Sequence, residues 1–380
     1  MLKVMTIVGT RPELIRLSRV IQRLDQTVEH VLVHTGQNYD YTLNEVFFHD
    51  LGLRKPDHLL GVDTSSLGRV LGETLIKTEE VLVAERPDAV LVLGDTNSCV
   101  AAVMAKRMRI PVYHMEAGNR CFDENVPEET NRRLVDHVAD FNLVYTEHAR
   151  RNLLSEGLPP RRILKTGSPM REVLNAYREP IIASDVLERM GLAEGGYFLV
   201  SAHREENVDS PTRLKMLLQC LVAVHQEFGL PVFVSTHPRT RKRLEVMPEA
   251  IEVQGVTFSE PLGFHDYNKL QLSAACCLSD SGTIAEESTL LGFPAITLRD
   301  SIERPEALDT GGIIMTGLHA GDVVAGIKTA MSAPRSRNGV SGLTPDDYLI
   351  DNTSERAVNF ILSTAHRHNA WAGIRTTEPT

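Results

Sequence analysis

Residues 114–133, HMEAGNRCFDENVPEETNRR, hold more ionisable side chains than a connecting loop needs. The carboxylates are Glu116, Asp123, Glu124, Glu128 and Glu129. The other ionisable groups are His114, Arg120, Arg132 and Arg133. The stretch follows the apolar run IPVY and therefore leaves the end of a buried strand. A solvated surface turn, a metal site or a pair of acid/base groups for proton transfer would each explain it.

A metal site has the least support. His114 and Glu116 form an H-x-E pair like the start of a deaminase zinc site, but the P-C-x-x-C partner and the H-E-x-x-H pattern are both absent. We therefore expect no metal and favour acid/base chemistry, with Glu116 ending a strand and Glu128 opening a helix. We expect Arg132, one helical turn beyond Glu128, to hold that carboxylate in place. His114 is expected to be structural, and the remaining acids and Arg133 to be solvated or capping.

Polar clusters also follow the other predicted strands. They occupy residues 9–13, 94–98, 203–207, 237–239 and 280–283. Because ligands of doubly wound sheets bind beyond the carboxyl ends of the strands, we expect all of them to line one cleft.

The segment GTRPE (9–13) could bind a phosphate. Thr10 can cap the following helix, Pro12 suits its first turn, and helix N-termini attract phosphate. Arg11 would add a fixed cation. An ordinary helix start is the alternative. Neither a P-loop nor G-x-G-x-x-G is present, so signatures for ATP and NAD are absent.

The segment SDSGTIAEES (279–288) is the stronger phosphate candidate. Ser281, Gly282 and Thr283 follow a strand and open a helix, where backbone N–H groups have no helical partner. Glu287 lies one turn after Thr283 and could accept hydrogen bonds from ribose hydroxyls. A capping box with a solvated acidic face is the alternative.

Four further strand-end residues each allow two interpretations. Asp95 is either a helix cap or a site carboxylate, and His203 and His237 are either structural or catalytic. Arg304 belongs either to a surface salt bridge or to the cleft.

Short β-branched runs alternate with helical patterns along the whole chain, which predicts parallel sheets covered on both faces. Strands are expected at 4–9, 30–36, 88–95, 110–116, 141–146, 196–203, 231–237, 276–280 and 294–298. Helices are expected near 65–84, 97–108, 128–138, 210–228, 267–274, 283–291, 320–332 and 354–367. The polar segment 167–195 is expected to be a linker with helices of its own.

The length of 380 residues suits two domains. We expect an α/β fold of two Rossmann-like doubly wound domains facing a central cleft. The expected boundaries are 1–168 for the domain with the acid/base residues and 169–353 for the nucleotide-binding domain. The terminal segment, 354–380, could pack back on the N-terminal domain.

The net charge of -10 argues against a nucleic-acid partner. The five cysteines show neither C-x-x-C nor a disulfide pattern, and no apolar run approaches a membrane span. The N-terminus lacks the features of a signal peptide. We expect no membrane contact and a cytoplasmic location.

Together, GTRPE, GDTNS, HMEAGNR, PEETNRR, SAHREEN, SDSGTIAEES and ERPEA resemble the non-hydrolysing UDP-N-acetylglucosamine 2-epimerase family over residues 3–365. The resemblance implies the GT-B domain arrangement, no redox cofactor, a UDP-N-acetyl amino sugar as ligand and a homodimer.

Several segments are most similar to one branch of that family. HTGQNYDYT, MEAGNRCFDENVPEE and SAHREENVD resemble enzymes that convert UDP-2-acetamido-2,6-dideoxy-L-talose to UDP-N-acetyl-L-fucosamine for capsule or O-antigen. Gln37, Asn38 and Tyr39 stand where enzymes acting on UDP-GlcNAc usually carry Q-H-R, which puts an activator site in doubt. Arg16 stands where the family usually has lysine, so the charge is kept and its geometry changes.

The family reaction implied for these residues expels UDP from C1 and passes through a 2-acetamidoglycal. By their matched positions, Asp95, Glu116 and Glu128 would be the acid/base groups, and His203 would lie near the leaving phosphate. Residues implied for binding UDP or the sugar are Arg11, Arg132, His237, Ser281, Gly282, Thr283, Glu287 and Arg304. Which carboxylate removes the proton stays open. So do the alternatives of a UDP-GlcNAc 2-epimerase, a GT-B glycosyltransferase, a hydrolysing epimerase and a non-catalytic sensor.

Overall fold

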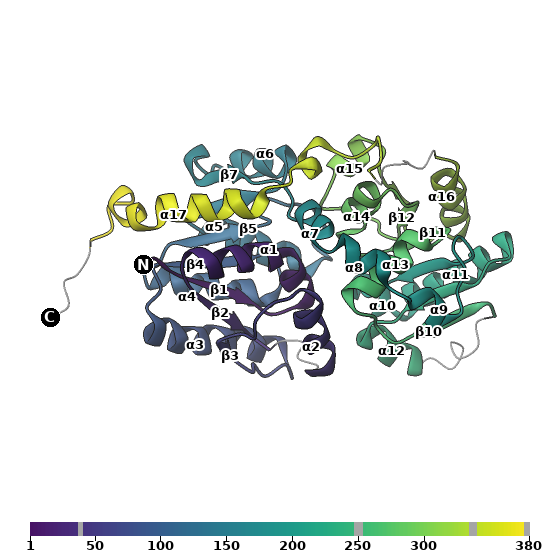
Figure 1. Cartoon of the computed structure of the whole chain (residues 1–380), viewed down its shortest axis with the longest axis horizontal. Coiled ribbons are helices and arrows are strands. Elements are labelled where there is room, and N and C mark those ends of the chain that lie inside the picture. The colour runs from purple at the N-terminus through teal and green to yellow at the C-terminus, as the bar shows by residue number, and fades with distance from the viewer. Residues whose placement is uncertain (37–40, 247–253, 334–339, 376–380) are drawn as a thin grey trace. The chain divides into compact units, whose positions relative to one another are not determined.

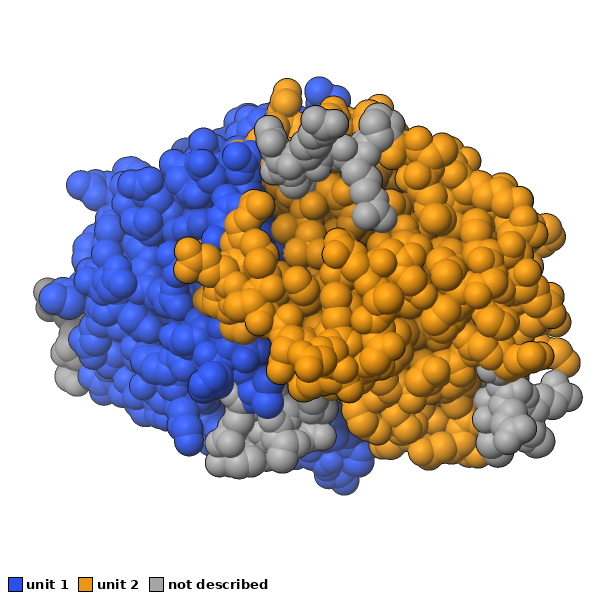
Figure 2. All heavy atoms as spheres, turned by 45° about the vertical axis from the view of Figure 1, so that its right-hand side comes forward, with its two compact units in different colours: residues 1–120, 127–175, 350–380 blue, residues 121–126, 176–349 orange. Residues whose placement is uncertain are grey.

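The computed structural model describes residues 1–36, 41–246, 254–333 and 340–375 of the chain. The chain forms two compact units, coloured separately in Figure 2. Unit 1 contains residues 1–120, 127–175 and 350–380, and unit 2 contains residues 121–126 and 176–349. Each unit is an α/β body around one parallel sheet.

The sheet of unit 1 has the strand order β3-β2-β1-β4-β5-β6-β7, and every pairing is parallel. The strands are β1 (Lys3–Val8), β2 (Glu29–His34), β3 (His58–Leu59), β4 (Ala89–Leu93), β5 (Val112–Met115), β6 (Phe141–Val144) and β7 (Ile163–Lys165). The central strand β4, AVLVL, is an uninterrupted and fully buried apolar run, as expected for a strand covered by helices on both faces.

Most helices of unit 1 bury apolar side chains against its sheet. They are α1 (Arg11–Thr27), α2 (Tyr41–Asp50), α3 (Leu67–Glu85), η1 (Asn97–Val100), α4 (Ala101–Arg107), α5 (Pro127–Val138), α6 (Glu147–Ser155), η2 (Pro160–Arg162), α7 (Met170–Ala176) and α17 (Thr353–Trp371). Leu82 of α3, Ala102 of α4 and Val135 of α5 share one core with alternate residues of the central strands, such as Val90 and Val92. The C-terminal helix α17 packs against α1 (Figure 1).

The sheet of unit 2 has the order β10-β9-β8-β11-β12-β13 and is also parallel. Its strands are β8 (Phe198–Ser201), β9 (Val232–Ser235), β10 (Val256–Ser259), β11 (Cys276–Ser279), β12 (Ala295–Thr297) and β13 (Ile314–Met315). Read by position, this order is 3-2-1-4-5-6, the doubly wound order of Rossmann folds.

The helices of unit 2 complete that fold. They are α8 (Arg178–Ala183), α9 (Val186–Met190), α10 (Glu205–Val208), α11 (Pro211–Phe228), α12 (Pro238–Glu245), α13 (Phe264–Ser273), α14 (Ile284–Leu291), α15 (Glu306–Asp309), α16 (Ala320–Ser332) and η3 (Asp346–Leu349). Leu217 and Leu221 of α11 and Ile327 of α16 pack with Phe198 and Val200 of β8 in its main core.

The expected fold class is confirmed for both units: each is a Rossmann-like α/β body with a parallel sheet. Four short strands, β3, β7, β10 and β13, were not predicted. Apart from β10, each has only two or three residues, too few to show a periodic pattern. The helix expected at 97–108 opens with the 3-10 turn η1.

The unit boundaries differ from those read in the sequence. The chain leaves unit 1 after Asn175 and returns to it at Ile350, whereas the expected boundaries were 168/169 and 353/354. Residues 121–126 group with unit 2, since Asp123 accepts a hydrogen bond from the hydroxyl of Ser301 at 3.1 Å. None of the helices in the described part of the chain is both long and apolar enough to cross a membrane.

Candidate active site

In each sheet, strand order reverses at one point, where the loops after two neighbouring strands diverge and leave a crevice. In unit 1 this point lies between β1 and β4, and in unit 2 between β8 and β11. The segments that follow these four strands are GTRPE, GDTNS, SAHREEN and SDSGT. The polar motifs of the sequence therefore lie at the positions where doubly wound sheets bind ligands.

Glu13 links the two loops at the switch point of unit 1. This fully buried carboxylate accepts hydrogen bonds from the Gly9 N–H at 3.0 Å and the Thr10 hydroxyl at 2.7 Å, and from the Ser98 hydroxyl after β4. Burial raises the pKa of Glu13, although these hydrogen bonds act in the opposite direction. Thr10 occupies the N-cap position but makes no side-chain cap bond, so its predicted capping role is wrong.

Arg11 begins α1, and its guanidinium carbon lies 5.4 Å from the ring centre of Phe47. A guanidinium over an aromatic face is attracted by the ring quadrupole. This contact holds the Arg11 guanidinium against Phe47 of α2.

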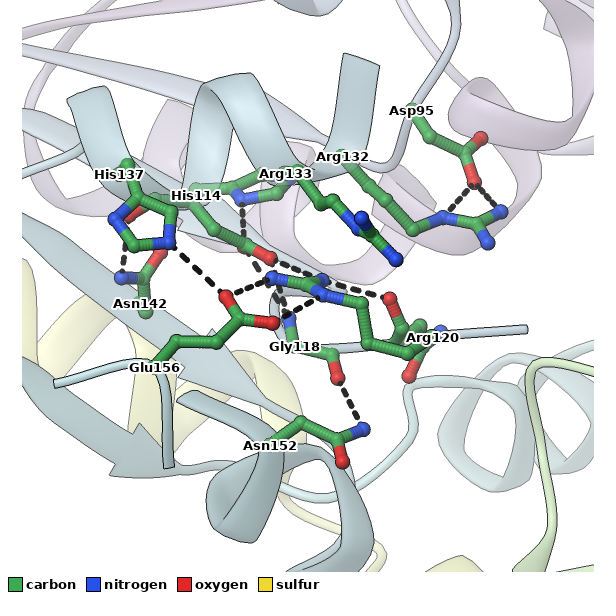
Figure 3. A network of polar contacts seen from close by, with 12 residues as sticks. Asp95, His114, Gly118, Arg120, Arg132, Arg133, His137, Asn142, Asn152 and Glu156 are labelled. Atoms are coloured by element: carbon green, nitrogen blue, oxygen red, sulfur yellow. Dashed lines mark hydrogen bonds and ion pairs between the residues drawn. The ribbon is translucent and has the colours of Figure 1, made fainter. Parts of the chain in front are cut away.

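Asp95 is held by an arginine from another element, as Figure 3 shows. Its carboxylate accepts hydrogen bonds from Arg132 Nε at 3.1 Å and Nη2 at 2.5 Å, and its side chain stays 27% exposed. Arg132 Nη1 donates to Glu129 at 2.7 Å. Arg132 therefore bridges a partly open carboxylate and a buried one.

The buried position of Glu129 contradicts the prediction that it is solvated or capping. It is 1% exposed and pairs with both Arg132 and Arg133. Glu128, its neighbour on the first turn of α5, is partly exposed instead. Helical residues one position apart point in directions about 100° apart, so only one of the two can face the sheet.

Glu116 follows β5 in an uncommon backbone conformation. Its φ is +66°, in the left-handed region that non-glycine residues seldom adopt and that is concentrated at functional sites. The carboxylate is buried and forms an ion pair with Arg16 of α1. Gly94 lies against it: a Cβ on Gly94 would stand 3.3 Å from Glu116 Oε2. Arg16, which stands where the family usually has lysine, is thus the partner of Glu116, a candidate acid/base group.

His203 lies at the switch point of unit 2, over the buried carboxylate of Asp280. The backbone N–H groups of His203 and Arg204 and the side-chain amide of Asn207 donate to Asp280 at 3.0–3.1 Å. The His203 ring itself is 37% exposed, with Nδ1 3.4 Å from Asp280. The ring of His237, at the start of α12, has its centre 5.6 Å from that of His203.

The turn Ser281–Thr283 joins β11 to α14 close to a carboxylate. The Ser281 and Thr283 hydroxyl oxygens are 3.0 Å apart. A Cβ on Gly282 would stand 2.7 Å from Glu303 Oε1, so no side chain fits there without a shift. Arg204 donates to the same oxygen at 2.9 Å.

A capping box with a solvated acidic face does not describe α14, because Thr283 makes no side-chain cap bond and only Glu287 of the two glutamates is partly exposed. Glu286 is fully buried and lies 2.6 Å from Arg304, which is also buried. Glu287 accepts a hydrogen bond from Gln271 at 2.6 Å. The alternative of a surface salt bridge for Arg304 is wrong as well, because the pair is internal to unit 2.

The sequence did not single out Glu13, Asp136, Asp280 or Glu303 as site residues. For Glu13, Asp280 and Glu303 the available signal was a place in a motif already quoted, whereas Asp136, in the interior of α5, had no such signal. Gln37, Asn38 and Tyr39, expected to bear on an activator site, lie outside the described residues. Within the described ranges, no group of three or more His, Cys, Asp or Glu side chains could hold a metal ion.

Comparison with known proteins places these motifs in one family. The family model described as UDP-N-acetylglucosamine 2-epimerase matches residues 22–362. The solved structure of UDP-N-acetylglucosamine 2-epimerase from Rickettsia bellii is 45% identical with a TM-score of 0.92, over 99% of this chain and 100% of that one. The Methanocaldococcus jannaschii UDP-GlcNAc 2-epimerase, solved in complex with UDP-GlcNAc and UDP, is 32% identical with a TM-score of 0.88, over 95% and 100%.

A third relative carries a different sugar in its name. UDP-2,3-diacetamido-2,3-dideoxy-D-glucuronate 2-epimerase of Pseudomonas aeruginosa is 34% identical over 87% of this chain and 92% of its own length. Relatives at similar identity thus differ in the sugar that they are named for.

Proposed function

The chain belongs to the UDP-N-acetylglucosamine 2-epimerase family, and from that premise we propose that it inverts C2 of a UDP-linked N-acetyl amino sugar by expelling UDP and adding it back. Membership makes the protein an isomerase acting on a UDP-sugar. The observation that carries the proposed mechanism is the placement of Asp95 and Glu116 after two neighbouring strands of the unit 1 sheet.

Expulsion of UDP is needed because the C2 proton of such a sugar has no carbonyl beside it. As the C1–O bond breaks, positive charge develops at C1 and the C2–H bond becomes acidic. A base removes that proton and leaves a 2-acetamidoglycal with UDP. Return of a proton to the opposite face of C2, and of UDP to C1, gives the epimer.

In this proposal, unit 1 supplies the acid/base groups. Glu116 and Asp95 are each paired with an arginine, Arg16 and Arg132 respectively, which holds the carboxylate in a fixed direction. Glu128 opens α5 and is the third candidate. Proton transfer by positioned carboxylates is worth about 10²–10⁴ in rate.

Unit 2 is proposed to stabilise the leaving UDP. His203 and the turn Ser281–Thr283 follow the two strands at its switch point, and charge develops on the departing diphosphate. Glu287 is proposed to bind the ribose, in keeping with its partly exposed place on α14. Arg11, Arg304 and His237 are proposed as further binding groups.

The proposed substrate is UDP-2-acetamido-2,6-dideoxy-L-talose, and the proposed product is UDP-N-acetyl-L-fucosamine. It is supported by the segments HTGQNYDYT, MEAGNRCFDENVPEE and SAHREENVD. UDP-GlcNAc is the second candidate, supported by the 45% identity to the Rickettsia bellii protein of that name.

The two substrates can be separated by isotope exchange. The enzyme is incubated in D2O with each nucleotide sugar, and C2 is followed by proton NMR. An epimerase of this kind exchanges the C2 proton for deuterium and forms the C2 epimer of its true substrate. We expect exchange with the 6-deoxy-L-talose nucleotide at a rate well above that with UDP-GlcNAc.

Each other outcome has one meaning. Faster exchange with UDP-GlcNAc would assign the second candidate. Accumulation of free sugar and UDP would indicate the hydrolysing type, and retention of the C2 proton in both nucleotides would overturn the proposed mechanism.

A further inference from the structure

His114 is fully buried on β5, two residues before Glu116, and lies in the polar network around Arg120 (Figure 3). Each of its ring nitrogens has a partner. Nδ1 lies 2.9 Å from a carboxylate oxygen of Asp136 on α5. Nε2 lies 2.7 Å from the carbonyl oxygen of Gly94, in the loop after β4. A carbonyl oxygen and an ionised carboxylate can only accept hydrogen bonds.

A neutral imidazole has one N–H and can therefore satisfy only one of these two acceptors. We propose that His114 is an imidazolium that holds the Gly94 carbonyl, and that it acts as a positioning residue for Glu116 and Asp95. The neutral form would place a bare nitrogen lone pair against either the carboxylate or the carbonyl in a buried site.

Asp136 is ionised in this arrangement, because all its other partners are donors. Its carboxylate accepts from Arg120 Nη1 at 2.7 Å and from the Gly118 N–H at 3.1–3.2 Å. If Asp136 were protonated, one of its oxygens would be a hydrogen-bond donor, and the donors Arg120, Gly118 and His114 would have one acceptor fewer. The shared proton thus resides on the ring rather than on the carboxylate.

Two carboxylates, Asp136 and Glu156, contact the one guanidinium of Arg120, and a positive His114 ring would offset the second negative charge. Arg120 is bound at its other side by Glu156 through Nε and Nη2, at 2.8 and 2.7 Å. Burial alone would raise the pKa of Glu156, but hydrogen bonds from Arg120 and His137 lower it below the ordinary value. Asp136 therefore faces both Arg120 and His114, whereas Glu156 faces Arg120 and His137. His137 stands at the exposed rim.

The held carbonyl is part of the proposed site, and this step rests on the proposed function. Gly94 has a φ of +72° and its Cα faces the Glu116 carboxylate, while the next residue is Asp95. A hydrogen bond from a charged donor fixes a carbonyl more strongly than one from a neutral donor. His114 thereby sets the distance between the two carboxylates that follow β4 and β5.

The protonation state can be read without substrate. The protein is labelled with ¹⁵N-histidine, and the ring nitrogen shifts of His114 are recorded at about pH 8, where an ordinary histidine is neutral. We expect both ring nitrogens of His114 to carry the shift of a protonated nitrogen. Free histidine recorded at the same pH serves as the neutral reference. A non-protonated nitrogen in His114 would overturn the proposal.

Asp136→Asn provides a variant with a defined spectroscopic change. An amide can direct an N–H group at Nδ1, which makes that nitrogen an acceptor while Nε2 keeps its proton for Gly94. We expect His114 to become neutral in this variant, with only Nδ1 moving to the non-protonated shift. A ring that stays doubly protonated would show that Asp136 does not hold the charge.

The positioning role is tested by His114→Gln against His137→Gln. Both remove a histidine from the same network, but His137 is 48% exposed and contacts Glu156 rather than Gly94. We expect His114→Gln to lower kcat about tenfold or more with KM within about twofold, and His137→Gln to leave both near the wild-type values. Equal effects of the two substitutions would refute the positioning role.

Failure of this inference and failure of the proposed function give different results. The ¹⁵N spectrum of the wild-type protein contains no substrate and does not depend on catalysis. Absence of C2 exchange together with a doubly protonated His114 would leave the imidazolium in place and refute only its link to epimerisation.

Discussion

Two fully buried histidines of unit 1 face opposite kinds of partner. His114 meets two acceptors, whereas Nδ1 of His34 accepts a hydrogen bond from the Gly36 N–H at 2.9 Å. Burial lowers the pKa of His34 to about 4, so this ring is neutral at neutral pH. Residue type and burial are the same in both cases, and the two rings differ in the hydrogen-bonding partners around them.

The depressed pKa of His34 predicts acid sensitivity. Below pH 6.5 the unfolded chain takes up a proton that folded His34 does not bind until about pH 4, so stability present above pH 6.5 is lost as the pH falls through this window. A shift from 6.5 to about 4 corresponds to about 3 kcal/mol. The variant His34→Gln keeps an acceptor for the Gly36 N–H. Between pH 7 and pH 4 we expect its free energy of unfolding to fall by about 3 kcal/mol less than that of the wild type.

Urea unfolding followed by the fluorescence of Trp371 measures this difference, because the only tryptophan of the chain lies on α17 in unit 1. His319→Gln removes an exposed histidine and is the control, with an acid response like that of the wild type. Equal acid responses of wild type and His34→Gln would show that another group causes the loss.

At the scale of elements, the strand–loop–helix segment from β5 to α5 carries most of the candidate chemistry of unit 1. Glu116 ends the strand, Arg120 lies in the loop, and Glu128, Glu129 and Arg132 share the first turns of the helix. Its two ends are joined by the Asp136–His114 contact and by the hydrogen bonds of Asp136 to Gly118 and Arg120. The element therefore positions its own side chains.

The helix α17 completes unit 1 from the far end of the sequence. Thr364 and Tyr113 share a hydrogen bond of 2.6 Å, and His368 lies 3.0 Å from Asp140. The ring of Phe360 meets those of Tyr113 and Phe141 edge to face. Residues 350–380 thus belong structurally to a unit that begins at residue 1.

This packing predicts that α17 stabilises unit 1. Ile361→Ala removes a fully buried side chain and should cost roughly 2–5 kcal/mol through lost burial and the cavity left behind. Leu362→Ala changes the next residue, which is 39% exposed, and should cost less than about 1 kcal/mol. Urea unfolding followed by Trp371 fluorescence measures the free energy of unfolding of both variants. Equal losses would mean that α17 contributes helix propensity rather than packing.

At the scale of the whole molecule, both sheets are doubly wound, but the loops at their switch points carry different residue types. The unit 1 loops carry carboxylates paired with arginines. The loops of unit 2 carry histidine, hydroxyl groups and backbone N–H groups. In the proposed function, this difference divides proton transfer from nucleotide binding.

A division of this kind predicts separable defects. We expect Glu116→Gln to lower kcat about a hundredfold or more while UDP affinity, measured by calorimetry, stays within about twofold. Glu287→Ala should weaken UDP binding about tenfold or more, since a carboxylate hydrogen bond to a ribose hydroxyl is lost. Glu179→Ala, on α8 of unit 2, is a surface control for the second substitution. Unimpaired turnover in Glu116→Gln would remove Glu116 from the mechanism.

The sequence by itself determined the fold class of both units, most of the central strands and the motifs that identify the family. Apolar β-branched runs that alternate with helical periods can form parallel sheets in few ways, and Asp95, Glu116, His203 and Ser281 then follow strands by necessity. These conclusions depend on local pattern and on the geometry of one sheet edge.

Only the tertiary structure decided which charges meet. Arg16 reaches Glu116 across 100 positions of sequence, and Arg132 reaches Asp95 across 37. Burial of Glu129 rather than Glu128, and the left-handed backbone of Glu116, are not encoded by residue type. The charge state of His114 likewise depends on Asp136 and Gly94, which lie on other elements. Pairing and protonation follow from distances between segments remote in sequence, and packing sets those distances.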